Sequence, residues 1–473
     1  MTVAVTGRTL DRAALVRVAR DGEPVALADD ARDRMIRSRA TVERVLARGE
    51  PVYGLSTAVG VLKRVGVGAN EAADYASRIL KNTAVGQGPP APADLVRGTM
   101  LRLAGHLAEG SPGVRPLLAE TLVRALNDGA LPRIRTLGSI GQGDLAPMAD
   151  LAVELFDHVP LQAGEGLALL ANNAFSTAWA ALAVTDAITL VDAMDVAGAL
   201  SLEGLAANLT ILHPAIGQVR PYPGLRDSLA RLGTLLEGSE LWDAGRARSL
   251  QDPLTFRNLP QIQGACRDTL AHVEAHLAIE LNASQGNPIV LVVEDRVISV
   301  ANFQMLPLAA ALDHLRIVLA SALSASAERS VKLLETPWSG LPTGLVPVPD
   351  TAEPGLYYLG IAVQSLAAEA RLLAQPVSFE MSSTVHAEGI EDRATMAPLA
   401  ARRVAGMIDL GERIVAIEFA VAAQAVELRG LRLGTGTRRA LGAIRQTVPF
   451  LALGDQVPDV EPLVPLIAAG RFR

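Results

Sequence analysis

The sequence predicts a mainly α-helical protein, a bundle of long helices with a small mixed part at its N-terminus. Half of the 473 residues are hydrophobic but only 3% are aromatic, so the core must be aliphatic. An alanine-rich, aromatic-poor chain favours close helix packing over a β-sandwich. Apolar residues recur at helical spacing over long stretches, whereas strand patterns are short and local. These helical stretches cover residues 28–49, 70–128, 164–207, 268–282, 305–334, 356–373 and 397–428.

The N-terminal elements are expected to be a short strand followed by helices. The helical pattern of residues 28–49 ends at Gly49, which is a suitable C-terminal cap. Glycine and proline at residues 86–92 and 110–113 should divide the next helical stretch into separate helices.

Further along the chain, a glycine-dense segment at residues 136–147 leads into a helix that we expect to start near Asp144. Such a loop can expose backbone donors at the beginning of the helix. Residues 287–303 have the pattern of a β-hairpin. We expect two domains, residues 1–200 with the loops and residues 201–473 as the central and C-terminal helical bundle.

Charge and cysteine content narrow the functional classes. The net charge is −7 with both signs interspersed, which argues against nucleic acid as a partner. The single cysteine, Cys266, excludes an intrachain disulfide framework and is expected to be a small buried hydrophobe. The longest uncharged stretch, residues 166–185, contains polar side chains and is interpreted as a buried helix. Charges near the N-terminus do not fit a signal peptide, so we expect a cytoplasmic protein without a membrane partner.

The histidines do not indicate a metal site. Seven are scattered along the chain, and only His272 and His276 share a helix face at spacing i, i+4. The segment reads HVEAH rather than HExxH, and no motif for a third ligand adjoins it. We therefore expect an ordinary surface or core pair and no metal.

Three side chains in polar segments are candidates for chemistry. Tyr53 lies in the glycine-flanked sequence YGLSTAVG and could serve as a general base if its pKa were lowered. Arg257 could clamp a substrate carboxylate through two hydrogen bonds. Glu391, next to Asp392 in the charged segment 388–396, could serve as acid, base or ion-pair partner. For each, a structural role remains open: a half-buried tyrosine, a surface arginine or a solvated charged face.

The glycine-dense segment is a fourth candidate, as an anion-binding or structural loop. It is not a phosphate loop, because no Lys-Ser/Thr follows. Each of these signals is weak alone, but together they form a series of motifs in a fixed order along the chain. In chain order the motifs are Tyr53-Gly54 with Thr57 and Gly60, Gly138-Ser139-Ile140-Gly141, Gly143-Asp144-Leu145-Ala146-Pro147, Glu165-Gly166-Leu167-Ala168-Leu169, Gln251-Asp252-Pro253 with Arg257, Pro260-Gln261, Gly264-Ala265, Asn287-Pro288, Asn302-Phe303 and Glu391-Asp392.

This series resembles the aromatic amino acid ammonia-lyases, the family of histidine, phenylalanine and tyrosine ammonia-lyases, from about residue 10 to about residue 430. The resemblance implies a fold of the ammonia-lyase (fumarase/aspartase-like) type. It also implies a homotetramer in which three protomers build each active site. The signature loop of the fumarase/aspartase superfamily itself, a rival group of helical tetrameric lyases, has no match in this sequence.

The chain departs from the family at the residues that form its prosthetic group. The family's Ala-Ser-Gly triad cyclises and dehydrates to methylidene-imidazolone (MIO), and the central side chain must be eliminated. Here the loop reads Gly141-Gln142-Gly143-Asp144, one residue shorter and without that serine. Gln142 cannot lose a β-leaving group, and Ser139 matches a different family serine. We therefore expect no MIO and no other cofactor, and Gln142 either donates an amide hydrogen bond or only closes the shortened loop.

Other pocket positions differ as well. The family's tyrosine in the arginine segment is Leu254, and its Ser-His pair falls on Asn82-Thr83, so that the histidine is absent. The family's active-site asparagine falls on Ala171, with Asn172 beside it. The expected catalytic residues are Tyr53, Glu391 and Gln142. The expected substrate-binding residues are Arg257, Asn302, Phe303, Thr83, Asn172, Leu254 and Gln251.

Three functions are consistent with this set. The first is an MIO-independent lyase that uses Tyr53 for proton transfer in elimination or addition on a carboxylate-bearing, amino-acid-like molecule. The second is a catalytically inactive family member with a binding or structural role. The third is an ordinary aromatic amino acid ammonia-lyase or aminomutase with an electrophile made in an unexpected way.

Overall fold

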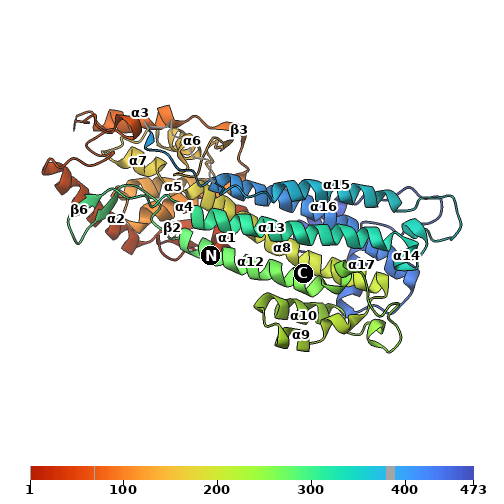
Figure 1. The fold of residues 1–473 in the computed structure, drawn as a ribbon. Coiled ribbons are helices and arrows are strands. Elements are labelled where there is room, and N and C mark those ends of the chain that lie inside the picture. The colour runs from red at the N-terminus through yellow and green to blue at the C-terminus, as the bar shows by residue number, and fades with distance from the viewer. Residues whose placement is uncertain (1, 69, 380–388) are drawn as a thin grey trace. The chain divides into compact units, whose positions relative to one another are not determined.

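The computed structural model describes residues 2–68, 70–379 and 389–473. Glu388 and His386 therefore lie outside the described residues. The chain forms two compact units, each built from three chain segments (Figure 1). The loop unit comprises Met1–Ala183, Val273–Leu312 and Pro376–Arg402, and the bundle unit comprises Val184–His272, Asp313–Gln375 and Arg403–Arg473. The boundary expected near residue 200 is close to the first of these divisions, but neither unit is one continuous stretch.

Short helices and three two-stranded sheets make up most of the loop unit. Its elements are β1 (Val3–Val5), α1 (Arg12–Arg20), β2 (Val25–Leu27), α2 (Asp29–Ala47), η1 (Gly60–Leu62), α3 (Ala72–Thr83), β3 (Gln87–Pro90), α4 (Ala93–Glu109), α5 (Pro116–Asp128), β4 (Arg135–Leu137), α6 (Leu145–Phe156), α7 (Glu165–Leu170), the start of α8 (Ala174–Leu205), β5 (Ile289–Leu291) and β6 (Arg296–Ile298). Strands β1 and β2 pair in parallel, whereas β3–β4 and β5–β6 are antiparallel.

Long helices dominate the bundle unit. Its elements, some of which begin or end in the loop unit, are α8, η2 (Leu209–Leu212), α9 (Ala215–Val219), α10 (Pro223–Leu235), η3 (Glu240–Trp242), α11 (Leu254–Arg257), α12 (Leu259–Glu280), α13 (Leu306–Leu333), α14 (Thr336–Ser339), η4 (Thr343–Leu345), α15 (Tyr357–Leu373), α16 (Ala397–Arg429), α17 (Thr435–Arg445), η6 (Glu461–Leu463) and α18 (Val464–Ala468). The mainly α class, the N-terminal strand, the hairpin at β5–β6 and the positions of α13, α15 and α16 confirm the sequence-based predictions.

Two predicted helices have different bounds. The stretch expected as one helix over residues 164–207 is broken between α7 and α8 at Ala171, Asn172 and Asn173. Helix α12 begins at Leu259, nine residues before the expected start at residue 268. Pro260 lies in its first turn, where proline is tolerated, and so does not break the helix.

Gly264 lies within α12 at a point that α10 approaches closely. A Cβ at Gly264 would lie 2.6 Å from the backbone nitrogen of Leu225. The glycine therefore permits close packing of α10 on α12.

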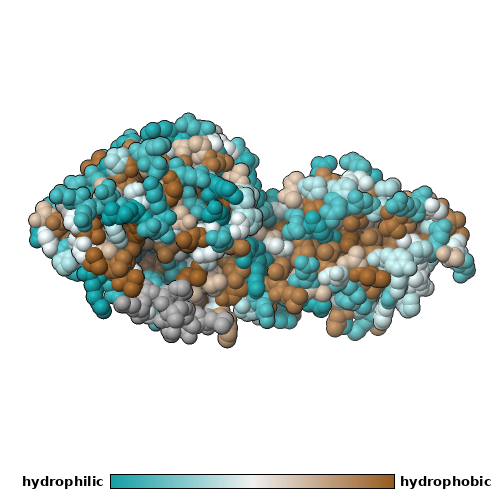
Figure 2. Space-filling view, turned by 90° about the horizontal axis from the view of Figure 1, so that it is seen from above, coloured by the Kyte–Doolittle hydropathy of each residue, from teal (hydrophilic) through white to brown (hydrophobic). Residues whose placement is uncertain are grey.

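The apolar residues form the expected aliphatic interior. Cys266 is fully buried, and burial raises the pKa of its thiol to about 12. The segment Glu165–Leu205 and helix α13 are long and apolar enough to span a membrane, but most of their residues are buried inside the protein. Figure 2 shows hydrophobic side chains reaching the surface of the bundle unit, where Ile361 and Leu372 of α15 are 60% and 75% exposed.

Candidate active site

The first feature of the site is the loop that carries Tyr53. Gly54 has a φ of +71°, and a Cβ there would lie 2.1 Å from Cδ2 of Leu167 in α7, so this close turn requires glycine. The phenol oxygen of Tyr53 accepts a hydrogen bond from the backbone N–H of Gly60 at 2.8 Å. Tyr75 of α3 accepts one from the next residue back, Val59, at 3.0 Å. Two phenols therefore hold the same loop.

The electrostatics of Tyr53 differ from the sequence-based expectation. Burial raises the pKa of its phenol above the ordinary value of 10, and the negative charge of Glu391 raises it further, while the hydrogen bond from Gly60 opposes the shift. Tyr53 is consequently protonated at neutral pH in this state, whereas a general base needs a lowered pKa. The charge effect also shows that the structure brings Tyr53 and Glu391, two predicted catalytic residues, into the same region.

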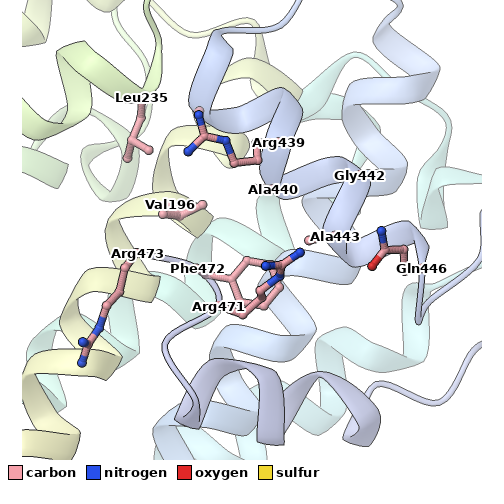
Figure 3. Close-up of a pocket in the computed structure, with 11 residues that line it drawn as sticks. Val196, Leu235, Arg439, Ala440, Gly442, Ala443, Gln446, Arg471, Phe472 and Arg473 are labelled. Atoms are coloured by element: carbon pink, nitrogen blue, oxygen red, sulfur yellow. The ribbon is translucent and has the colours of Figure 1, made fainter.

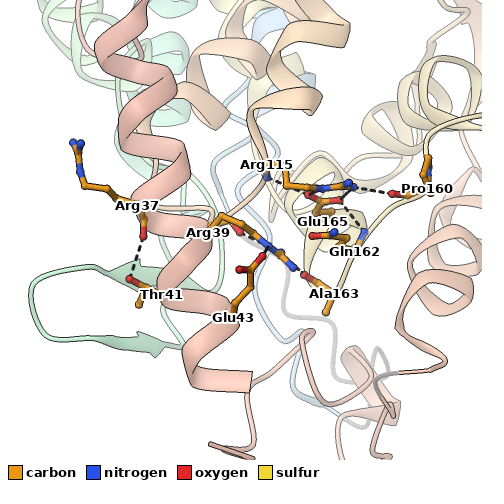
Figure 4. Close-up of polar contacts among 10 residues, drawn as sticks. Arg37, Arg39, Thr41, Glu43, Arg115, Pro160, Gln162, Ala163 and Glu165 are labelled. Carbon is orange, nitrogen blue, oxygen red and sulfur yellow. Dashed lines mark hydrogen bonds and ion pairs between the residues drawn. The ribbon is translucent and has the colours of Figure 1, made fainter. Parts of the chain in front are cut away.

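Helix α7, which supports the tyrosine loop, is anchored by a buried carboxylate (Figure 4). Glu165 has no exposed surface and accepts hydrogen bonds from the backbone N–H and the guanidinium of Arg115 and from the backbone N–H of Gln162. Arg39 of α2 donates to the carbonyl of Ala163 at 3.0 Å. These contacts fix the start of α7, whose Leu167 limits the space beside Gly54.

The second feature is the glycine-rich loop before α6. Gly138, Gly141 and Gly143 all have positive φ, at +106°, +78° and +70°. The carbonyl of Ile140 accepts hydrogen bonds from the backbone N–H groups of Thr395 and Met396, at 3.1 and 2.9 Å.

The next carbonyl, that of Gly141, is held from two directions. The Thr395 hydroxyl donates to it at 2.7 Å, and the Asn173 amide donates to it at 3.3 Å. A Cβ at Gly141 would lie 2.3 Å from Oγ1 of Thr395. The loop is thus clamped between the segment that precedes α16 and the break between α7 and α8.

Asp144 fixes the other end of this loop. Its carboxylate is fully buried and accepts hydrogen bonds from Ser139 Oγ (3.0 Å) and from the backbone N–H and hydroxyl of Ser176 (2.7 Å each). Its own N–H donates to the carbonyl of Asn172 at 2.7 Å. Burial outweighs these bonds and raises the pKa of Asp144 to about 6. The sequence placed a helix start here but did not reveal this positioning role.

Gln142 lies at the centre of the loop. It is 9% exposed, and its backbone forms an isolated antiparallel bridge with Gln304. Its side-chain oxygen has no hydrogen-bond partner among the residues that the structure describes. Gln304 is preceded in the chain by half-buried Phe303 and exposed Asn302. The structure therefore brings Gln142, Asn302 and Phe303 into one region.

The two neighbouring asparagines have different tasks. Asn172 is fully buried, and its amide nitrogen donates to Ala168 and Leu169 while its oxygen accepts from the backbone N–H of Ala174. These bonds cap the helices on either side and give Asn172 a structural role, while its part in substrate binding stays a prediction. Asn173 faces the loop, and its side-chain oxygen has no partner within the described part of the chain. Sequence reasoning missed Asn173 because it offered only the residue next to the expected position.

His106 is a second residue that the sequence did not indicate. It lies in α4 with no exposed surface, and neither ring nitrogen has a hydrogen-bond partner among the described residues. A Cβ at Gly286 would lie 3.3 Å from its Nε2, and the adjacent Gln285 also has an unpartnered side-chain oxygen. Burial, followed by the charge of Arg102, lowers the pKa of His106 to about 3, so the ring is neutral. Each of four residues thus has at least one buried side-chain polar atom without a described partner. We call these residues, His106, Gln142, Asn173 and Gln285, the unpaired cluster.

The remaining predicted residues have simpler surroundings. Thr83 is the last residue of α3 in the loop unit and is half-buried. The bundle unit contains the other three, in and just before α11. Arg257 donates from Nη1 to Oε1 of Gln251 at 2.9 Å, which holds its guanidinium in place, and Leu254 is 62% exposed.

Within the described residues no group of three or more His, Cys, Asp or Glu side chains could hold a metal ion.

Solved structures define the class of protein. The fold matches the ergothioneine-degrading enzyme ergothionase from Treponema denticola, with a TM-score of 0.94 and 27% identity over 100% of this chain and 99% of that one. It also matches tyrosine aminomutase from Streptomyces globisporus, with a TM-score of 0.92 and 26% identity over 100% and 98% of the two chains. The protein thus has the mainly helical fold of ammonia-lyases and aminomutases.

Sequence comparison gives the family. The model of the aromatic amino acid lyases matches residues 10–158 and 156–446. Histidine ammonia-lyase from Symbiobacterium thermophilum is 34% identical over 100% of this chain and 98% of its own length. The chain belongs to the aromatic amino acid lyase family.

Proposed function

We propose that this protein is a lyase that eliminates an amine from a carboxylate-bearing, amino-acid-like substrate without an MIO group. The observation that carries the proposal is Gln142, which occupies the centre of the clamped loop in a chain that otherwise retains the family fold. The retained Tyr53, Glu391 and Arg257 supply proton transfer and carboxylate binding.

The loop residues do not fit the MIO group. Ring formation by the family's route eliminates a β-substituent from the central residue, and Gln142 has none to lose. Ser139 is occupied, because its hydroxyl donates to Asp144 and accepts from the backbone N–H of Gly141 at 3.2 Å. Bulky Ile140 follows it, where the family's ring has glycine. No step of the proposed reaction therefore runs through this group.

A substrate with a better leaving group removes the need for covalent activation. Ammonia is a poor leaving group, and covalent activation of an amine is hard to replace by positioning alone. A quaternary ammonium group instead departs as a neutral tertiary amine without prior protonation. The likeness to ergothionase supports this substrate class, since that enzyme degrades ergothioneine. Chemically, ergothioneine is a betaine with a trimethylammonium group beside its carboxylate. We propose a betaine of this kind as the substrate.

The residues divide the work as follows. Arg257, oriented by Gln251, binds the carboxylate through charge-assisted hydrogen bonds. Tyr53 takes the proton from the carbon adjacent to the one that bears nitrogen. The C–H electron pair forms the new double bond, and the C–N pair leaves with the tertiary amine. A cationic substrate stabilises the phenolate and so counteracts the burial and the Glu391 charge that raise the pKa of Tyr53.

The assembly and location are part of the proposal. Tyr53 and Glu391 belong to the loop unit, whereas Gln251 and Arg257 belong to the bundle unit. By its resemblance to the family, we propose a cytoplasmic homotetramer in which protomers share the active sites. Sedimentation of the purified protein measures the oligomeric state, and a stable monomer would contradict this part.

The test is to incubate the protein with ergothioneine and with histidine and to measure trimethylamine, ammonia and the absorbance of the unsaturated product. We expect trimethylamine from the betaine, no ammonia from histidine, and an unmodified intact mass. Tyr53→Phe should abolish turnover, whereas Tyr75→Phe, which removes the neighbouring loop-holding phenol, should retain it within about tenfold.

Other results would point to the two other functions. Ammonia release together with a mass lower by two waters in the loop peptide would indicate an ordinary ammonia-lyase. A folded protein without turnover on any amino-acid-like carboxylate would indicate an inactive family member.

A further inference from the structure

A cavity of about 300 Å³ lies entirely within the bundle unit (Figure 3). Helix α17 forms one wall, the residues after α18 form another, and α8 and the end of α10 contribute single side chains. The lining of the cavity includes Val196, Leu235, Arg439, Ala440, Arg471 and Phe472, together with Arg473. Its volume is at the lower end of the range of small-molecule sites.

The charge of this cavity is unlike that of the whole chain. The protein carries a net charge of −7, yet the lining includes three arginines and no acidic residue. Arg473 is already engaged, since it donates to the hydroxyl of Thr189 and lies 3.8 Å from the Asp192 carboxylate. Arg439 and Arg471 are exposed, and their guanidinium groups have no hydrogen-bond or ion-pair partner among the described residues.

Neighbouring arginines show that this is not the general state of the unit. Arg432 lies 3.6 Å from Asp243, Arg413 lies 3.0 Å from Glu461, and Arg445 pairs with Glu427. The guanidinium groups of Arg220 and Arg371 in the same unit also lack a hydrogen-bond or ion-pair partner among the described residues, but they do not line the cavity. Arg439 and Arg471 differ from them because two such guanidinium groups line one concave space. Figure 3 shows Arg439 reaching in from α17 and Arg471 from the C-terminal segment. An unpaired pair of guanidiniums concentrates positive potential in a concave space and attracts anions.

The floor of the cavity is apolar. Val196, Ala440 and Phe472 are only 3%, 6% and 3% exposed, and Leu235 adds a further aliphatic side chain. A few convergent charged groups over a hydrophobic lining are typical of sites for small organic ligands. A bare inorganic anion would use the guanidiniums but gain nothing from the apolar floor.

We infer that this cavity binds a small organic carboxylate with an apolar or aromatic body. The carboxylate accepts charge-assisted hydrogen bonds from Arg439 and Arg471, and the body packs against Phe472 and Val196. The site is separate from the proposed catalytic residues and does not depend on the proposed reaction.

Calorimetric titration with trans-cinnamate tests this inference. The neutral amide cinnamamide and inorganic phosphate serve as comparison probes. Titrations are done in the Arg257→Gln background, so that carboxylate binding at the proposed catalytic site is removed. We expect cinnamate to bind with a dissociation constant of about 1 mM or tighter. Replacing both Arg439 and Arg471 with Gln should weaken binding at least about tenfold.

The matched control is Arg432→Gln, an exposed arginine of the same unit that does not line the cavity, which should leave cinnamate binding within about twofold. Cinnamamide should bind at least about tenfold more weakly than cinnamate. The inference is overturned if cinnamate does not bind, if the double variant binds it unchanged, or if phosphate binds as tightly as cinnamate. Thermal melts of the variants show whether the fold is retained.

Discussion

Two regions of buried polar side chains, one in each compact unit, differ in how completely their polar atoms are hydrogen-bonded. In the bundle unit, fully buried Glu418 accepts hydrogen bonds from Ser201, Ser326 and two nitrogens of Arg329. In the loop unit, the unpaired cluster retains polar atoms without partners among the described residues, although three of its members are fully buried and Gln142 is only 9% exposed. The Glu418 region satisfies its buried carboxylate within the protomer, whereas the unpaired cluster leaves part of its polarity unsatisfied among the described residues.

This difference separates buried polar groups that stabilise the fold from buried polar groups that are proposed to serve a substrate. A buried polar group without a partner costs roughly 1–3 kcal/mol, so folding alone gives no reason to retain several of them. The unpaired cluster adjoins the loop of Gln142, where a substrate is proposed to bind. The Glu418 network has all its bonds in place and holds helices together. The four predictions below test whether the two groups differ in this way, in order of expected effect.

The largest effect is expected when the satisfied network is broken. Arg329→Met leaves the buried carboxylate of Glu418 with only two hydroxyl donors, which should lower the free energy of unfolding by about 3–5 kcal/mol. Urea denaturation measures this value. Arg413→Met is the control, because its ion pair with Glu461 is partly exposed and should be worth less than about 1 kcal/mol. Equal losses for the two variants would remove the distinction.

A smaller loss is expected from Gly141→Ala in the clamped loop. Alanine there must adopt a φ of +78° and would bring its Cβ to 2.3 Å from Thr395, so we expect a loss of about 2–4 kcal/mol. Gly129→Ala is the matched control, with a φ of +72° and no atom within 4 Å, and it should cost about 1 kcal/mol. If both cost the same in thermal melts, backbone strain rather than the clamp limits the loop.

The third prediction concerns acid stability and His106. Its pKa is about 3 when folded and close to 6.5 when unfolded, so the unfolded chain binds a proton first as the pH falls. The free energy of unfolding therefore falls between about pH 6.5 and pH 3. At pH 5 it should be lower by roughly 2 kcal/mol. His106→Leu should remove this loss, so the variant gains about 2 kcal/mol on wild type between pH 7.5 and pH 5. Parallel stability curves would show that another group titrates instead.

The smallest effect on stability is expected at Gln142. Its side-chain oxygen has no described partner to lose, so Gln142→Met should change the free energy of unfolding by no more than about 1 kcal/mol. If the amide acts in the proposed reaction, turnover of the betaine should fall at least about tenfold in the same variant. A large loss of stability with turnover unchanged would make Gln142 a structural residue.

The long helices could be predicted because their signal is local. Apolar residues at helical spacing located α13, α15 and α16 to within two residues. The break between α7 and α8 could not be found this way, since it depends on a hydrogen bond from Asp144 to the carbonyl of Asn172, 28 positions later. Pairing of β3 with β4 also joins segments that are distant in sequence, and Gln87–Pro90 contains two prolines that disguise a strand.

The candidate site was predicted less completely than the fold. The sequence identified Tyr53, Glu391 and Gln142, and the structure places all three in the loop unit. The sequence could not give the direction of the Tyr53 pKa, which depends on burial and on the charge of Glu391. His106 also escaped, because a lone histidine among apolar residues carries no signal until its missing partners are seen.

The clamped loop has a consequence for any attempt to convert this protein into an MIO enzyme. Gln142→Ser would supply a hydroxyl but would not lengthen the loop, which the sequence comparison with the family's motif predicts to be one residue shorter. The carbonyl of Ile140 accepts hydrogen bonds from Thr395 and Met396, and the N–H of Asp144 donates one to Asn172, so an inserted residue would have to bulge out between two fixed points. A designer would have to rebuild the contacts of Thr395 and Asn172 at the same time. If the proposal of a loop without MIO is right, we expect that no single substitution at Gln142 generates the ring.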